Sequence, residues 1–151
     1  MTAYDLAQRF VGEIQERPGE AQHPLIQWWH SRCGLGFDAA DEVPWCSSFV
    51  NGIAWELRLP RSKSAAARSW LTIGSAVEIE AARAAYDIVV LKRGTGHQPG
   101  PEVTSGAPGH VGFFAGVESE TVLVLGGNQG NTVSIARFST VHILGIRRLQ
   151  P

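Results

Sequence analysis

The apolar pattern of this chain changes half-way along its length, and this change limits the folds that are open to it. Up to about residue 71, apolar side chains recur at the three- and four-residue spacing of amphipathic helices. Beyond residue 88 they fall in short runs that are separated by turn residues, which is typical of strands. Helices followed by closely connected strands indicate an α+β domain. We therefore predict N-terminal helices packed on a C-terminal antiparallel β-sheet.

Proline, glycine and capping residues set the expected limits of these elements. The expected helices run from Ala3 to Pro18-Gly19, from Pro24 to about Gly34, from Cys46 to just before Pro60, and from Ser64 to Leu71, the last with Ser62 or Ser64 as its N-cap. The expected strands lie at 88–91, 110–117, 121–125, 132–136 and 144–149. Residues 93–109 are rich in glycine and proline and are expected to form a long loop, a length that is often functional.

Composition removes several classes of function. The chain has 151 residues, of which 44% are hydrophobic and 18% are charged, as expected for one domain with its own core. The formal net charge of -1 argues against nucleic acid or anionic lipid as the main partner. No stretch approaches the length of a membrane span, and residues 1–6 lack the pattern of a Sec signal. We expect a single domain over residues 1–151, made in the cytoplasm and not inserted into a membrane.

Cys46 lies in the first turn of the third expected helix. Its apolar face has helical spacing and consists of Cys46, Phe49, Val50, Ile53, Ala54 and Leu57. Pro44 suits a helix start, where a missing N–H costs nothing. A thiol in the first turn lies near unpaired N–H groups and the positive end of the helix dipole, which favour the thiolate. The alternative is that Cys46 is simply a small buried apolar residue. A nucleophilic Cys46 must be a free thiol, with Cys33 as a packed bystander.

A cysteine nucleophile needs a base, and His110 is the best placed of the five histidines. It opens an expected strand on the face that carries two glycines, which leave room for a close approach. If Val117 pairs with Thr121 across a three-residue loop, the same register sets His110 opposite Asn128. Opposed residues have Cβ atoms about 4.5–5.5 Å apart, so Asn128 could orient the ring. A bulge at Gly126-Gly127 would move this pairing by one or two residues.

Together these segments resemble the NlpC/P60 and CHAP peptidases, papain-like cysteine hydrolases of bacterial peptidoglycan. The similarity is greatest to a small phage and prophage branch. Five segments match in family order: Pro44-Trp45-Cys46-Ser47-Ser48-Phe49-Val50-Asn51, Ala67-Arg68-Ser69-Trp70-Leu71, Asp87-Ile88-Val89-Val90, Gly109-His110-Val111-Gly112-Phe113 and Leu125-Gly126-Gly127-Asn128-Gln129. Two features depart from the pattern. Trp45 stands where many relatives carry Asp, and the 93–109 loop is longer than usual, which suggests a flap over the cleft.

The resemblance implies a papain-like fold and a catalytic set. Cys46 would be the nucleophile, His110 the general base and acid, and Asn128 the residue that orients the ring. The backbone N–H of Cys46 would help to hold the oxyanion. The reaction implied is hydrolysis of an amide bond in the peptide part of the bacterial cell wall, by an endopeptidase or an amidase without a separate wall-binding module.

The biological setting follows from the same resemblance. A phage or prophage endolysin released through a holin-type pore fits the absence of a Sec signal. A secreted antibacterial effector with the same chemistry is an alternative. A non-catalytic wall-binding domain and an acyltransferase on this fold also stay open.

Four further residues are candidates for substrate binding: Trp45, Arg68, Trp70 and Gln129. Arg68 could grip a substrate carboxylate or form a surface salt bridge. Trp70 could line a groove or pack in the core. The role of Trp45 cannot be transferred from relatives that carry Asp there. Gln129 follows Asn128 in the matching segment.

The sequence predicts no metal site and no cofactor. Asp38, Asp41 and Glu42 precede the cysteine, in a region where some CHAP enzymes bind calcium. Their spacing does not match an EF-hand loop, and a capping or solvent-exposed cluster is the stronger interpretation. No His/Cys cluster has the spacing of zinc ligands. The expected partner is peptidoglycan, and the chain is expected to be a monomer.

Overall fold

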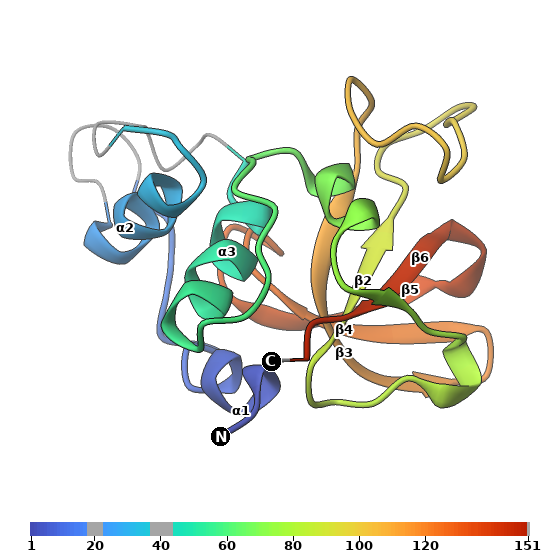
Figure 1. The fold of residues 1–151 in the computed structure, drawn as a ribbon, viewed down its shortest axis with the longest axis horizontal. Helices are drawn as coiled ribbons and strands as arrows, with labels where there is room; N and C mark the ends of the chain where they lie inside the picture. Colours follow the sequence, from blue (N-terminus) through green and yellow to red (C-terminus); the bar gives the residue numbers. More distant parts are fainter. Residues whose placement is uncertain (18–22, 37–43, 151) are drawn as a thin grey trace.

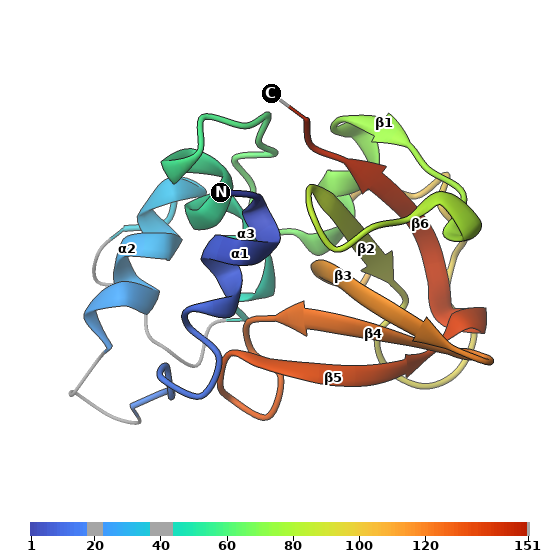
Figure 2. The ribbon, with the colours of Figure 1, turned by 90° about the horizontal axis from the view of Figure 1, so that it is seen from below.

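Helices and strands form two layers, as the change in apolar pattern predicts (Figure 1). The structure is a computed structural model, and it describes residues 1–17, 23–36 and 44–150. The α+β class is confirmed, because three helices pack on one side of a six-stranded antiparallel sheet (Figure 2). In the described part of the chain, no helix is long and apolar enough to cross a membrane.

The helices are α1 (Ala3–Gln8), α2 (Pro24–Arg32) and α3 (Cys46–Glu56), and the last two agree with expectation. Helix α1 is shorter than predicted. Gly12 takes a positive φ of 78°, and Gln15 then forms a β-bridge with Thr132. The chain beyond Gln8 therefore pairs with the sheet region instead of continuing the helix.

The fourth expected helix is a 3-10 helix, η1 (Ala67–Thr72), and it starts later than predicted. Its N-cap is Ala66, without a side-chain hydrogen bond, so neither serine caps it as expected. The hydroxyl of Ser64 instead accepts a hydrogen bond from the Ala66 N–H at 3.1 Å. This serine stabilises a turn ahead of the helix.

The sheet has the strand order β1-β6-β2-β3-β4-β5, with antiparallel neighbours throughout. The strands are β1 (Ser75–Ala76), β2 (Asp87–Leu91), β3 (His110–Glu118), β4 (Thr121–Gly126), β5 (Ser134–Ser139) and β6 (Ile143–Arg148). Five of them were expected, and the two-residue β1 was not. Short 3-10 turns, η2 (Ile79–Ala81) and η3 (Thr140–His142), complete the fold.

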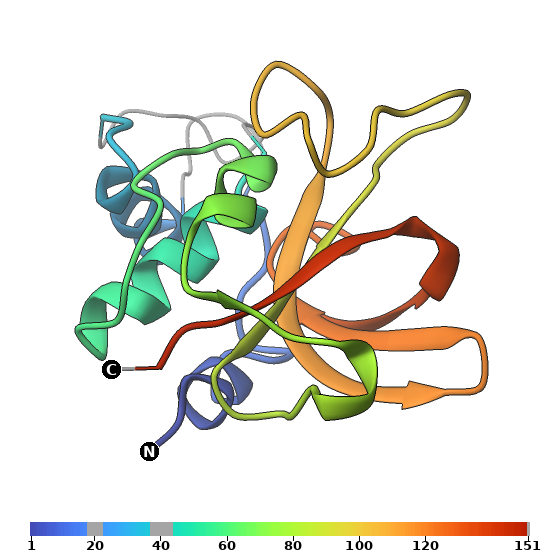
Figure 3. The ribbon, with the colours of Figure 1, turned by 45° about the vertical axis from the view of Figure 1, so that its right-hand side comes forward.

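Strand β2 lies in the middle of the sheet and is buried on both faces. Ile88 and Val90 join the main core with the helices, whereas Val89 and Leu91 join a smaller apolar cluster on the opposite face. This two-sided burial explains the unbroken apolar run of β2. The loop from β2 to β3 leaves the sheet at the end of Leu91 and returns at His110, projecting beyond the strands (Figure 3).

Candidate active site

Cys46 is the first residue of α3 and is 3% exposed. Both cysteines are free thiols, as expected. Trp45 is the N-cap of the helix and is fully buried, with its ring stacked on that of Trp29 at 5.9 Å. The indole Nε1 donates to Glu16 Oε1 at 2.6 Å. This anchored tryptophan fixes the helix start and with it the position of the thiol.

The surroundings of Cys46 lower its pKa. The largest single influence is burial, which raises the pKa because it disfavours the charged form. A hydrogen bond with the His110 side chain, the charge of His110, a backbone hydrogen bond at Val111 and the charge of Arg93 together outweigh burial. The net direction is toward the thiolate, which is the nucleophilic form of cysteine.

His110 begins β3, is 4% exposed, and has one ring nitrogen held by Gln129. Its Nε2 lies 2.8 Å from Gln129 Oε1. The amide nitrogen of Gln129 donates to the carbonyl oxygens of Val124 at 3.1 Å and Ser134 at 2.7 Å. Carbonyl oxygens only accept, so the amide oxygen of Gln129 must face the histidine and His110 Nε2 must carry a proton. Nδ1 is then the nitrogen left for the thiol.

The prediction that Asn128 orients the ring is wrong, because Gln129 makes that contact. Strand β4 ends at Gly126, and Asn128 takes a positive φ of 59° in the turn that follows. The chain therefore leaves the ladder before a residue at 128 can face His110. Gln129 has one more methylene than asparagine and reaches back to the ring from the turn.

Two glycines make space for this arrangement. A Cβ atom at Gly126 would lie 2.6 Å from Gln129 Oε1, and one at Gly127 would lie 2.7 Å from the Trp45 ring. Such distances are too short for any side chain. Two close approaches therefore explain the glycine pair in the matching segment. Gln129 comes close to the chain at Gly126, and the Trp45 ring at the start of α3 comes close to it at Gly127.

The structure also corrects the expectation that Trp45, Arg68 and Trp70 bind substrate. All three side chains have 0% exposure, so none of them presents a surface to a ligand. The Trp70 indole donates to Ser47 Oγ at 2.9 Å, which ties η1 to α3. Gln129 is also buried, and its side-chain oxygen is occupied by the contact with His110.

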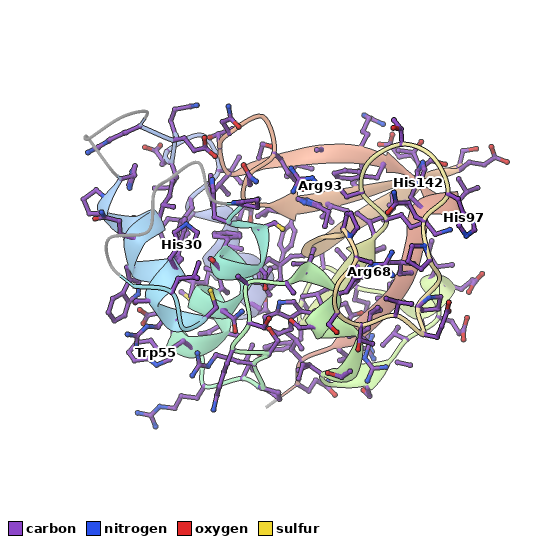
Figure 4. All side chains as sticks on the ribbon, turned by 90° about the horizontal axis from the view of Figure 1, so that it is seen from above. His30, Trp55, Arg68, Arg93, His97 and His142 are labelled. Atoms are coloured by element: carbon purple, nitrogen blue, oxygen red, sulfur yellow. The ribbon has the colours of Figure 1, made fainter. Side chains whose placement is uncertain are left out.

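Arg68 organises the loop that leads to His110. Its guanidinium group donates to four backbone carbonyls, those of Pro108 at 2.8 Å, Gly100 at 2.9 Å, and Pro99 and Val103 at 3.0 Å. The buried positive charge of Arg68 is thus stabilised by four carbonyl dipoles instead of by a carboxylate. This set of hydrogen bonds fixes residues 99–108 of the loop that the sequence predicts to be a flap. Figure 4 shows Arg68 next to that loop.

The remaining polar residues of the Cys46 segment support the helix. Asn51 donates to the carbonyl oxygens of Ser47 at 3.0 Å and Ser64 at 3.2 Å, and its Oδ1 accepts from the Lys63 N–H at 2.9 Å. Sequence reasoning did not assign these roles. The helical spacing of Ser47 and Asn51, which places both on one face, is the signal that could have found them.

A pocket of about 530 Å³ opens beside His110. Its walls come from Lys92 to Gly94, the turn after β4, strand β5 and His142. The ring of Phe138 lies over that of His110, with centroids 5.3 Å apart. A larger hollow of about 1040 Å³ is lined mainly by residues of the 76–82 segment and of strands β3 and β6, and by neither a cysteine nor a histidine. The pocket beside His110 is thus the one associated with the candidate site.

The described part of the chain offers no cluster of metal-ligating side chains. Among residues 1–17, 23–36 and 44–150, no group of three or more His, Cys, Asp or Glu side chains is placed to hold a metal ion. The acidic cluster of Asp38, Asp41 and Glu42 lies outside the described residues.

Comparison with known proteins leaves the site as the main guide to function. No family model, no curated protein and no solved structure matches this chain. The geometry of Cys46, His110 and Gln129 is therefore the basis for a functional proposal.

Proposed function

We propose that this protein is a cysteine hydrolase that cleaves an amide bond in the peptide part of peptidoglycan. The observation that carries the proposal is an arrangement of three side chains. The Cys46 thiol lies at a helix start, a hydrogen bond with His110 lowers the pKa of that thiol, and Gln129 fixes the tautomer of His110. Nucleophile, base and orienting group are the three parts that covalent catalysis by cysteine requires.

The reaction follows from the two nitrogens of His110. The Cys46 thiolate attacks the amide carbonyl carbon, and the C–N bond breaks as Nδ1 of the protonated ring donates its proton to the leaving amine. Water then loses a proton to Nδ1 and attacks the thioester, which releases the acid and restores the thiol. Throughout, Gln129 Oε1 accepts from Nε2 and so keeps Nδ1 directed at the sulfur.

The helix start assists this reaction in a second way. Backbone N–H groups in the first turn of a helix have no intrahelical partner, and the dipole is positive there. The Cys46 N–H is thus suited to stabilise the oxyanion as the carbonyl is attacked. Cys46 and His110 are both nearly covered, and of the two only His110 lines the pocket, so we expect a substrate to approach the pair from the His110 side.

The choice of peptidoglycan rests on the five matching segments, three of which contribute residues that support the candidate site. Trp45 and Ser47 hold α3, Arg68 holds the loop, and Gly127 makes room for the helix start. Within this class we favour a papain-like phage or prophage endolysin. A secreted antibacterial effector would use the same residues.

Loss of turbidity of purified peptidoglycan tests the proposal. Wild type should clear the suspension, and C46A and H110A should each be slower by at least about a thousandfold, since such groups act as a unit. C33A is the matched control, a buried thiol removed elsewhere, and it should retain activity. A fully active C46A, or a wild type that releases no fragments, would disprove the proposal. Mass spectrometry of the fragments would identify the bond.

A further inference from the structure

The pocket beside His110 carries an excess of positive charge. Lys92, Arg93, Arg137 and His142 line it, and no aspartate or glutamate does. Arg137 forms an ion pair with Glu118, so its charge is partly compensated. Arg93, at the start of the loop from β2 to β3, and His142, at the end of η3, both line the pocket.

Lys92 and Arg93 keep their charge available. Within the described part of the chain, the side chains of Lys92, Arg93 and His142 form no salt bridge. Arg93 is exposed and Lys92 is half-buried, at the edge of the pocket. Cations gathered around a hollow without a counter-charge form a site for an anion.

Arg93 connects this pocket to the nucleophile. Its charge is among the influences that favour the Cys46 thiolate, so the guanidinium lies within electrostatic reach of the sulfur. His110 lines the same pocket, so an anion held at Arg93 lies in the hollow that opens beside the candidate base.

The uncharged part of the pocket favours a small organic anion over a bare inorganic one. Phe138 and Ala136 provide an apolar surface, and Asn128 and Ser134 provide polar side chains that can hydrogen-bond to a peptide. Arginine binds carboxylates in a planar, bidentate manner.

We propose that this pocket binds a free carboxylate of the peptide substrate, next to the amide bond that Cys46 attacks. The inference rests on the proposed function and adds to it the required charge of the substrate. It assigns Arg93 as the principal carboxylate ligand, with Lys92 as a supporting cation.

The test measures binding without catalysis. N-acetyl-dialanine, which places a carboxylate beside one amide bond, is titrated into the C46A protein at pH 7, and NMR shifts of residues 92–94 are followed. The C-terminal amide of the same peptide and inorganic phosphate are titrated in parallel. We expect the acid to bind at least about tenfold more tightly than the amide, because a charge-assisted pair is lost.

Variants assign the effect to Arg93. C46A/R93Q should lose about tenfold in affinity for the acid and nothing for the amide, and R93K should restore part of the loss. R83Q is the matched control, since Arg83 is exposed and does not line the pocket. Equal binding of acid and amide, unchanged binding in R93Q, or equally tight binding of phosphate would overturn the inference.

These results stay separate from the test of the proposed function. The titration needs no turnover, so carboxylate binding can be established even if peptidoglycan is not cleaved. Conversely, if wild type clears peptidoglycan while acid and amide bind C46A equally, the hydrolase proposal stands and the carboxylate site fails.

Discussion

The two cysteines of this protein lie in similar settings and have opposite electrostatics. Cys46 and Cys33 are both free and nearly covered, at 3% and 6% exposure, and both have histidines nearby. The pKa of the Cys46 thiol is lowered, whereas burial raises the pKa of Cys33. Burial opposes ionisation at both sites, so the difference comes from their partners.

At Cys33 a serine stands between the thiol and the histidine. Ser48 Oγ lies 3.1 Å from Cys33 Sγ and 2.8 Å from His30 Nδ1. The thiol also donates to the His30 carbonyl at 3.3 Å. The hydrogen bonds at Cys33 involve a hydroxyl and backbone groups, and they do not outweigh burial, so the pKa of this thiol is raised. A cysteine and a histidine in one core are therefore not enough, because the ring must face the sulfur directly.

The largest expected difference between the two thiols is in alkylation. With iodoacetamide at pH 7, Cys46 should react at least about a hundredfold faster than Cys33, because the thiolate is the reacting form. Their similar exposure means that access alone does not explain such a ratio. Mass spectrometry of digests at timed intervals gives both rates.

The pH profile of this reaction has a definite sign. The alkylation rate of Cys46 should rise with pH to a midpoint below that of an ordinary thiol, because its pKa is lowered. In H110A the midpoint should move to higher pH, since the hydrogen bond and charge of His110 are lost. C33A should leave it in place. Equal rates for both cysteines in wild type would remove the contrast.

The next largest effect concerns the residue behind the histidine. Q129L should lower turnover by about 10–100-fold, the usual cost of losing an orienting partner. N128A, a change at the neighbouring position, should stay close to wild type because its side chain does not hold the ring. The measurement is initial clearing rate of peptidoglycan. A larger loss in N128A than in Q129L would reverse our assignment.

The exchange of Asn128 for Gln129 also shows how much of the site could be predicted from the sequence. The predicted pairing of β3 with β4 is correct near His110, where Phe113 pairs with Leu125. The geometry that produces this pairing differs from the one assumed. The loop has two residues, not three, and a bulge at Ala115 compensates for the shift. Neither the bulge nor the turn that follows Gly126 is set by apolar alternation. The neighbourhood of the base was therefore predictable, and the identity of its partner was not.

The burial of Arg68 and Trp70 could not be predicted from the sequence for a related reason. Trp70 and Arg68 have the chemistry of ligand-binding residues, and only three-dimensional packing decides whether a carbonyl or a substrate meets them. Arg68 meets four carbonyls of a loop that is distant in sequence. The helices α2 and α3 were predictable because their apolar spacing and proline starts are local signals.

A smaller effect tests the structural role of the Cys33 cluster. S48A removes the hydroxyl between Cys33 and His30 and should lower the free energy of unfolding by about 1–2 kcal/mol, because buried polar groups lose a partner. Urea unfolding measures this change, with S105A at an exposed serine as control. Activity should be retained. A large loss of activity without loss of stability would instead place this cluster in the reaction.

The smallest expected effect is that of Arg93 on the pKa of Cys46. Its charge is the least of the influences that favour the Cys46 thiolate, and Arg93 is exposed, where water screens it. R93Q should raise the Cys46 pKa, and by less than H110A does, while Cys33 should not respond. The alkylation pH profile at low salt measures this shift, and added salt should reduce it in wild type. R83Q has the same loss of charge and should leave the profile unchanged. If R93Q and R83Q behave alike, Arg93 acts only through net charge, and the electrostatic link between the pocket and the nucleophile is lost.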